Sequence, residues 1–126
     1  MRKNRKIAAA VGAVLLILII MIVAAAIRNG YPLKAVYLEK EDGDGIFVNL
    51  TAEYPFTGTI PEGELYDEAG GEITEQDLNS GDVVNIYGNG IMAESYPAQY
   101  HGITKIERTE QANQTYIQEY GHYLDE

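Results

Sequence analysis

The sequence contains no cysteine and no tryptophan, and it has only two histidines, His101 and His122. Without cysteine the chain can form neither an internal disulfide nor a link to a disulfide-bonded partner, and it lacks the residue that bacterial lipoproteins acylate. The usual cysteine and histidine ligand sets of zinc are missing as well. We therefore expect no cofactor, and a fold held by packing and hydrogen bonds alone.

Basic residues are also scarce after the first part of the chain. From Arg28 onward there are five lysines and arginines against nineteen aspartates and glutamates, a formal net charge of −14. Nucleic-acid binding depends mainly on lysine and arginine displacing counterions from phosphates, so no nucleic-acid partner is expected. A surface of this sign favours cations and basic peptides, or serves only to keep a domain soluble.

The N-terminal segment has the opposite character. Residues 1–6 form a basic flank, and residues 7–27 contain no charged or polar side chain. A helix of that length, rising ~1.5 Å per residue, spans roughly 30 Å and matches the hydrocarbon core of a bilayer. The basic flank predicts that residues 1–6 stay in the cytoplasm and that the rest of the chain is extracytoplasmic.

Two fates remain open for the apolar segment. As a signal anchor it gives a single-pass protein of the cell membrane, whereas as a signal peptide it is removed and the domain is secreted. Ala24 and Ala26 would permit cleavage before Ile27. The apolar run is longer than the roughly 7–15 residues of a typical cleaved segment, which favours a retained transmembrane helix. A short spacer, residues 28–32, follows it.

The rest of the chain has the pattern of a mainly β domain over residues 33–110. Residues 33–40 are rich in β-branched and aromatic side chains, which favours a first strand. Residues 45–53 alternate, with Ile46 and Val48 on one face, and this predicts a half-buried strand. Further short strands are expected within residues 64–73, 82–95 and 102–110.

Turn signals separate these strands. Pro55 and Pro61 argue against a regular helix or a central strand in residues 54–63. Asn89–Gly90 favours a type I′ hairpin turn, after which Ile91 is expected to resume pairing with the preceding strand.

A single helical turn is predicted from Thr74, which is followed three residues later by Asp77, with a stop at Gly81. Five to six short strands with one helical turn are typical of a small β-barrel of the oligonucleotide/oligosaccharide-binding (OB) type, and a five-stranded sandwich is the alternative. Residues 111–126 form a C-terminal tail. Its apolar residues recur at helical spacing and predict a short helix on the barrel, through Tyr116, Ile117, Tyr120, Tyr123 and Leu124.

Two short elements carry a resemblance to a known family. Gly81, Asp82 and Val84 form a "GD-x-V" strand start, and residues 94–99 read "ESYPAQ". Together they resemble the YobA-like domain of small exported proteins of Gram-positive bacteria. The resemblance implies an exported location and a small β domain. It implies no chemistry, because that family has no assigned activity.

The "ESYPAQ" segment is the main candidate site. Pro97 has no amide hydrogen, so it belongs at a strand end or bulge, and pairing should stop near Tyr96 and resume by Ile103. The segment is either a structural corner, fixed by polar side chains and covered by tyrosines, or a place where a ligand binds. The candidate ligand-binding residues are Glu94, Tyr96, Gln99 and Tyr100.

Two weaker sites define the alternatives. Glu41, Asp42 and Asp44 form an acidic turn that is a weak metal candidate, although Ile46 and Phe47 stand where a calcium loop needs an oxygen ligand and a glycine. Ser95 and His101 superficially supply parts of a hydrolase, but no nucleophile elbow surrounds the serine. We therefore expect no enzyme.

These patterns predict a membrane-anchored extracytoplasmic β-barrel module with a non-catalytic binding or modulatory role at the bacterial cell envelope. The expected partners, besides the membrane itself, are an envelope protein, a peptide or a glycan. A module that responds to divalent cations through the acidic turn is the alternative.

Overall fold

The computed structural model describes residues 12–21 and 31–125. They belong to two compact units, Met1–Tyr31 and Pro32–Glu126. In the first unit residues 12–21 are helical, and the eight large apolar side chains from Val14 to Met21 are each between 50% and 62% exposed.

The predicted N-terminal span is thus described only in its middle. Across the two described stretches, no helix combines the length and the apolar character needed to cross a membrane. Other predicted features lie outside the described residues: the basic flank 1–6, the span's ends at 7–11 and 22–27, spacer residues 28–30, and Glu126 at the end of the tail.

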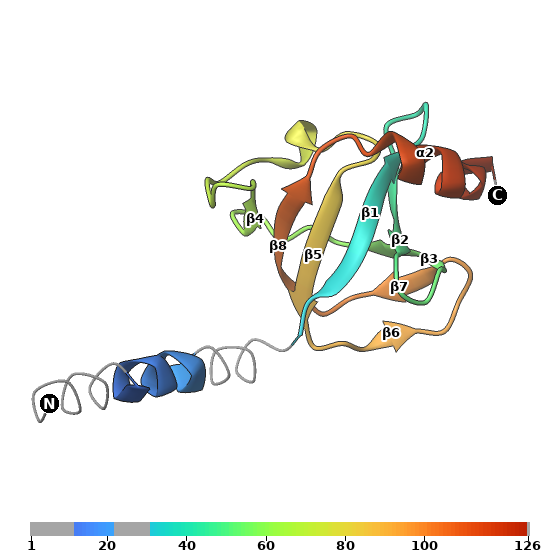
Figure 1. Ribbon diagram of the computed structural model, residues 1–126. Coiled ribbons are helices and arrows are strands. Elements are labelled where there is room, and N and C mark those ends of the chain that lie inside the picture. Colours follow the sequence, from blue (N-terminus) through green and yellow to red (C-terminus); the bar gives the residue numbers. More distant parts are fainter. Residues whose placement is uncertain (1–11, 22–30, 126) are drawn as a thin grey trace, which may run out of the picture. The chain divides into compact units, whose positions relative to one another are not determined.

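The second unit is mainly β, which confirms the predicted class, but its eight strands exceed the five or six expected. A 3₁₀ turn, η1 (Glu75–Asp77), precedes β5, and helix α2 (Gln114–Tyr120) and a 3₁₀ segment, η2 (Gly121–Asp125), follow β8 (Figure 1). The strands are β1 (Leu33–Glu39), β2 (Gly45–Asn49), β3 (Pro55–Gly58), β4 (Leu65–Tyr66), β5 (Val83–Gly88), β6 (Met92–Ala93), β7 (Ala98–Tyr100) and β8 (Ile103–Glu110).

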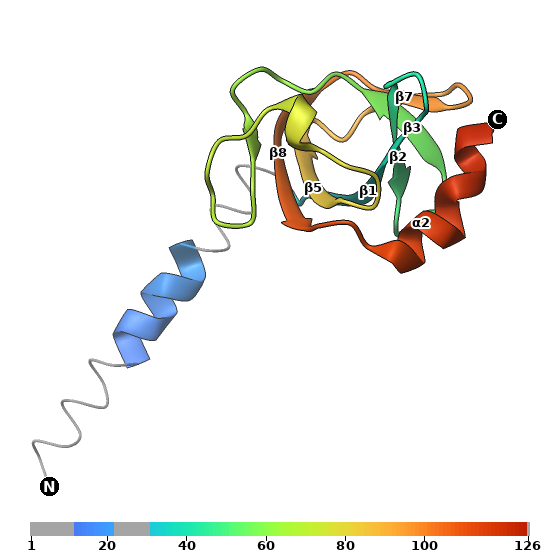
Figure 2. The same ribbon diagram turned by 90° about the horizontal axis from the view of Figure 1, so that it is seen from above.

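All eight strands belong to one open sheet in the order β4-β8-β5-β1-β2-β3-β7-β6. In β1, Val36 lies opposite Val48 of β2 on one side and Val83 of β5 on the other, both antiparallel. Two pairs are parallel, β3 with β7 and β4 with β8. Seen from above, the strands curve around a common interior (Figure 2). The main hydrophobic cluster is built from this sheet and from Leu78, and includes Tyr37, Phe47, Phe56, Ile86, Tyr100 and Ile106.

The predicted helical turn is confirmed at η1. The Asp77 carboxylate accepts a hydrogen bond from the Thr74 amide at 2.8 Å, as in a capping box. That bond lowers the pKa of Asp77. The turn ends at Asp77, before the predicted stop at Gly81, which instead adopts a positive φ of 91° in the approach to β5.

Strand β2 is buried on both faces, so the prediction of a half-buried strand is wrong. Ile46 and Val48 belong to a second hydrophobic cluster, while Phe47 faces the main one and its ring stacks on that of Phe56, with centroids 5.5 Å apart. The alternation along the strand identified one apolar face correctly. The alternation did not predict that the opposite face is also buried, where the side chain of Phe47 packs into the main cluster.

The C-terminal tail forms the predicted helix and packs through the predicted face. The Asn113 side chain begins α2 by accepting a hydrogen bond from the Tyr116 amide at 3.0 Å. The apolar side chains of α2 and η2 then cover one face of β1 and β2 and complete the second hydrophobic cluster. Its members are Val36, Leu38, Ile46, Val48 and Tyr120, with Leu50, Tyr116, Ile117, Tyr123 and Leu124 packed against them.

Two tyrosines tie this helical segment to the turn between β2 and β3. The Tyr120 hydroxyl donates to a carboxylate oxygen of Glu53 at 3.0 Å, and the Tyr123 hydroxyl donates to the Glu53 carbonyl at 3.1 Å. Glu53 itself has a positive φ of 54°, a conformation that L-residues adopt rarely. The contacts from α2 and η2 therefore hold a strained turn in place.

Stability is expected to fall at alkaline pH because of two buried tyrosines. Burial, with the charge of Glu39, raises the pKa of Tyr37 to about 12, and burial, with the bond to Glu53, raises the pKa of Tyr120 to about 12. An unfolded tyrosine titrates near pH ~10. The folded state thus holds these protons more tightly, and its advantage is complete below pH ~10 and lost as the pH rises toward 12.

Urea unfolding between pH 8 and 12 measures this loss. Tyr37→Phe and Tyr120→Phe should each flatten the decline above pH ~10. Tyr31→Phe is the matched control, because its ring is 86% exposed. If the free energy of unfolding of Tyr37→Phe and Tyr120→Phe still declines above pH ~10 as in the unmodified protein, these two tyrosines do not cause the loss of stability.

Strand β3 corrects a second expectation. Residues 54–63 were predicted to contain no central strand, yet β3 lies between β2 and β7 in the sheet. Pro55 is its first residue, where a missing amide hydrogen is tolerated. The other proline, Pro61, lies beyond the strand's end at Gly58. Two prolines therefore bounded a strand instead of preventing one.

Candidate functional site

The 89–97 segment, which carries β6 and leads from β5 to β7, does not form the predicted hairpin. β5 pairs with β1 and β8, whereas β6 pairs with β7. Two hydrogen bonds turn the chain at this point. The Asn89 side chain accepts from the Ile91 amide at 3.0 Å, and the Gly90 amide donates to the Tyr100 hydroxyl at 2.8 Å. Gly90 has the positive φ expected of a turn glycine, 74°.

The corner at Pro97 is present. Pairing stops after Ala93, three residues before Tyr96, and resumes at Ala98, within the predicted limit of Ile103. Pro97 lies in this gap, and the Tyr96–Pro97 peptide bond is cis. Within the described residues neither Glu94 nor Gln99 makes a side-chain hydrogen bond or ion pair, so the polar support expected from them is not seen.

The four candidate ligand-binding residues separate into two groups. Glu94 and Gln99 are exposed, and Tyr96 is 67% exposed. Tyr100 is 2% exposed, and its ring lies in the main cluster, 6.4 Å from that of Phe56. Tyr100 is thus placed to pack, while the other three lie where a ligand can reach them. A hollow of about 190 Å³ beside Gln99 is smaller than ordinary ligand pockets, which begin near ~300 Å³.

Ser95 and His101 are both exposed. The Ser95 hydroxyl donates to the carbonyl of Pro97 at 2.7 Å, so its proton is directed to the neighbouring backbone. A serine nucleophile needs that proton to be shared with a base such as histidine. The local geometry gives no support to a hydrolase at this position.

The acidic turn between β1 and β2 is organised by its own backbone. A carboxylate oxygen of Asp42 accepts from the Asp44 amide at 3.0 Å, and the Gly43 amide donates to the Lys40 carbonyl at 3.0 Å. Among the residues that the structure describes, no three histidine or acidic side chains converge to hold a metal ion. Glu41, Asp42 and Asp44 act in this structure as a polar turn.

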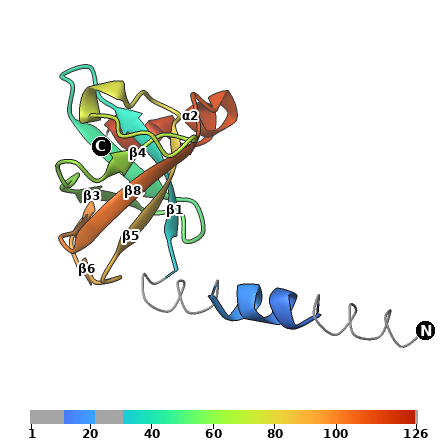
Figure 3. The same cartoon turned by 90° about the vertical axis from the view of Figure 1, so that its left-hand side faces the viewer.

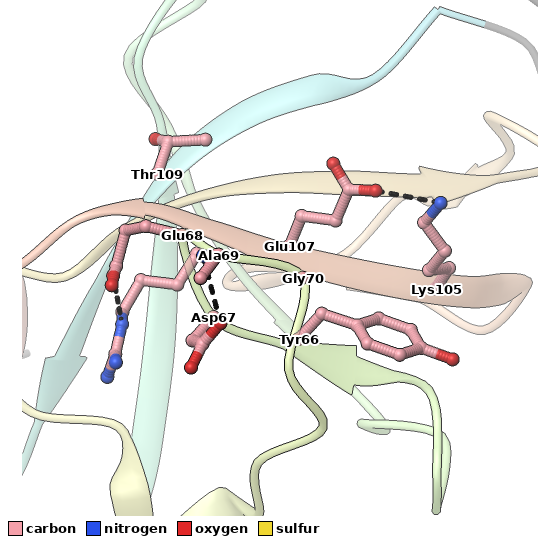
Figure 4. Close-up of a pocket in the computed structure, with 9 residues that line it drawn as sticks. Tyr66, Asp67, Glu68, Ala69, Gly70, Lys105, Glu107 and Thr109 are labelled. Atoms are coloured by element: carbon pink, nitrogen blue, oxygen red, sulfur yellow. Dashed lines mark hydrogen bonds and ion pairs between the residues drawn. The ribbon is translucent and has the colours of Figure 1, made fainter.

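A hollow lies between the loop after β4 and strand β8 (Figure 4). This β4–β8 cleft has a volume of about 610 Å³, within the ~300–1,000 Å³ range of ligand sites. One wall is the 66–70 loop, and the other is formed by side chains of β8. In Figure 4 the ring of Tyr66 lies below the ribbon of β8, and the side chains of Lys105 and Glu107 extend above it.

Local hydrogen bonds shape the loop wall of the cleft. One carboxylate oxygen of Asp67 accepts from the amides of Ala69 and Gly71, at 2.9 and 2.8 Å. Gly70 between them has a positive φ of 84°, which the sharp turn requires. The Tyr66 hydroxyl donates to a Glu64 carboxylate oxygen at 3.2 Å, so its ring is also held.

The strand wall carries an ion pair. Lys105 Nζ lies 2.7 Å from a Glu107 carboxylate oxygen and 4.8 Å from the centre of the Tyr87 ring. The hydrogen bond to Glu107 raises the pKa of Lys105, so the ammonium stays charged. Both side chains remain over one third exposed, which leaves them free to exchange partners with a ligand.

Arg108 also lines the cleft. Its Nε donates to a carboxylate oxygen of Glu68, and its Nη1 donates to the Asp77 carbonyl at 3.0 Å and to Asp82 Oδ2 at 3.4 Å. The bond from Arg108 lowers the pKa of Glu68. For Arg108 burial acts against the charge, but the bond to Glu68 and the charges of Glu68 and Asp82 outweigh it and raise its pKa.

Asp82 is a buried connector beneath this arginine. Its side chain is 1% exposed and accepts from the Asn79 and Ala112 amides, both at 2.9 Å. It thereby links the approach to β5, the arginine of β8 and the entry to α2. Arg108 already forms hydrogen bonds to Glu68, Asp77 and Asp82. Of the two cations that line the cleft, Lys105 is therefore the one that a ligand can contact.

The cleft was not predicted from the sequence. In the sequence its charged residues do not differ from the polar residues usual on strands and loops. Arg108 contacts Glu68 and Asp82, which are 40 and 26 residues away from it in the chain. One signal was available: Arg108 is one of only five basic residues from Arg28 onward. In so acidic a domain, an arginine within a strand is expected to pair with carboxylates.

No protein-family model, curated protein or solved structure matches this chain in the comparisons with known proteins.

Proposed function

We propose that this chain is a membrane-anchored, extracytoplasmic binding module of the bacterial cell envelope, without catalytic activity. The observation that carries the proposal is the helix over residues 12–21, which exposes large apolar side chains from Val14 to Met21. Such a surface is stable in lipid and unfavourable in water. The basic flank on its N-terminal side favours an orientation with the acidic domain outside.

We further propose that the sheet is an OB-like barrel of the YobA-like type. Only residues 101–102 separate β7 from β8. β7 pairs with β3 and β8 pairs with β5, so in the proposed barrel these two strands act as one bent strand. The antiparallel β1-β2-β3 meander, followed by a parallel β3–β7 pair, supports this topology.

The β4–β8 cleft is the proposed binding site. It offers the flat ring of Tyr66 beside an exposed ion pair, Lys105 with Glu107. An aromatic face with nearby donors and acceptors suits a sugar ring or a peptide backbone. We therefore assign the ligand to the polar peptides and glycans of the envelope.

Binding of a soluble wall glycopeptide to the full chain in nanodiscs tests this assignment. Tyr66→Ala and Lys105→Ala should each weaken the affinity about tenfold, equivalent to ~1.4 kcal/mol, in titration calorimetry. Lys40→Ala is the matched control, because it removes the same charge at the far end of β1. Equal affinities in all three variants would exclude the cleft, and an absence of heat with the unmodified chain would exclude this ligand class.

A further inference from the structure

The exposed apolar side chains of the folded domain gather in one segment. Among the residues described from Pro32 to Asp125, the large hydrophobic side chains that remain strongly exposed are Ile91 and Tyr96, at 68% and 67%. Both belong to the 89–97 segment, one on each side of β6. Single exposed hydrophobic residues need no explanation, but two on one protruding segment of a small domain call for one.

This segment lies at the end of the domain where the chain enters it. The first residue of β1, Leu33, is paired with Ile86 of β5, and β5 ends two residues later at Gly88. The Asn89 amide then donates to the Gly102 carbonyl at 3.2 Å, which holds the start of the segment against the beginning of β8. Figures 1 and 3 both place β6 at the end of the sheet from which β1 begins.

Charge is distributed unevenly between the two ends of the sheet. Residues 86–106 contain a single carboxylate, Glu94, together with His101 and Lys105. The turn at the other end of β1, residues 39–44, contains four carboxylates. An anionic lipid surface would thus repel the entry end less than the end that carries residues 39–44.

The tether limits how far the entry end can be from the membrane. Five residues, 28–32, join the apolar segment to β1. At a maximum of ~3.6 Å per residue they reach about 18 Å. If the apolar segment is a retained anchor, as the proposed function requires, the entry end cannot leave the headgroup region by more than this distance.

We propose that the 89–97 segment rests in the interfacial layer of the bilayer, with the side chains of Ile91 and Tyr96 inserted among the lipids. Tyrosine is favoured at this depth because its ring is apolar and its hydroxyl is polar. The contact orients the domain so that its acidic end and the β4–β8 cleft are held in a fixed direction relative to the membrane. The inference rests on the anchor of the proposed function and adds a second, reversible contact to it.

The absence of tryptophan makes the test direct, because each introduced indole is the only one in the chain. The full chain is reconstituted in vesicles of zwitterionic and anionic phospholipids, with or without brominated acyl chains, as separate variants Ile91→Trp and Tyr96→Trp. We expect both to emit at shorter wavelength than in water and to lose emission to the brominated lipid. Glu41→Trp, in the acidic turn at the other end of β1, should show neither effect.

Leu16→Trp, within the apolar helix, separates failure of the inference from failure of the anchor. Quenching of Leu16→Trp without quenching of Ile91→Trp and Tyr96→Trp would overturn the bilayer contact and leave the anchor intact. An unquenched Leu16→Trp would overturn the anchor itself. A blue-shifted but unquenched Ile91→Trp would show that protein covers the segment, for example a second copy of the chain, and would also overturn the inference.

Discussion

Asp82→Ala is expected to lower the free energy of unfolding by about 3–5 kcal/mol, since it removes one partner of a buried ion pair. The carboxylate is 1% exposed, and its loss leaves Arg108 with less compensating charge and the Asn79 and Ala112 amides without an acceptor. Small domains have total stabilities of only ~5–15 kcal/mol, so a large part of this one depends on a single side chain.

Urea unfolding followed by circular dichroism measures the change. Asp42→Ala is the matched control, because that carboxylate accepts from one amide in an exposed turn. Such a surface substitution should stay within about 0.5 kcal/mol of the unmodified protein. Equal midpoints for Asp82→Ala and Asp42→Ala would contradict the role of Asp82 as a buried connector.

Phe56→Ala is expected to cost about 3–5 kcal/mol, the usual range for deleting a buried aromatic ring. Phe56 is 0% exposed, and its ring lies between those of Phe47 and Tyr100. The cavity would open where β3 joins the sheet to β7. Both the parallel β3–β7 pair and the packing of Tyr100 should weaken as a result.

Thermal unfolding and hydrogen exchange at β7 report this loss. Thr57→Ala on the same strand is the control, because its side chain is only half-buried and small. If Phe56→Ala unfolds at the same temperature as Thr57→Ala, then β3 does not hold the core in the way described. Accelerated exchange restricted to β7 would identify the β3–β7 pair as the part most affected.

Local patterns predicted the elements that depend on neighbouring residues. Five apolar positions in residues 111–126 predicted the packing face of α2 and η2, and the Thr74–Asp77 pair predicted the turn at η1. Both are short-range features, in which helical spacing or one capping bond determines the outcome. The first strand, β1, was equally evident from its β-branched and aromatic content.

The predictions failed where the interacting strands or side chains are distant from each other in the chain. Asn89–Gly90 has the composition of a hairpin turn, but β5 already has β1 and β8 as neighbours, so β6 joins β7 instead. The β4–β8 cleft depends on Arg108 meeting Glu68 and Asp82, and no local pattern encodes that meeting. Tyr100 was predicted as a candidate ligand-binding residue, yet it is 2% exposed and its ring packs near that of Phe56.

The position of α2 has a consequence for the order in which the domain is completed during synthesis. One face of β1 and β2 is closed by residues 114–125, which are made some seventy residues later than the strands they cover. Until that segment emerges, Val36, Leu38, Ile46 and Val48 present an uncovered apolar strip. Folding of the domain therefore cannot finish until residues 114–125 have been synthesised, and until then the strip is the apolar surface that a chaperone would meet.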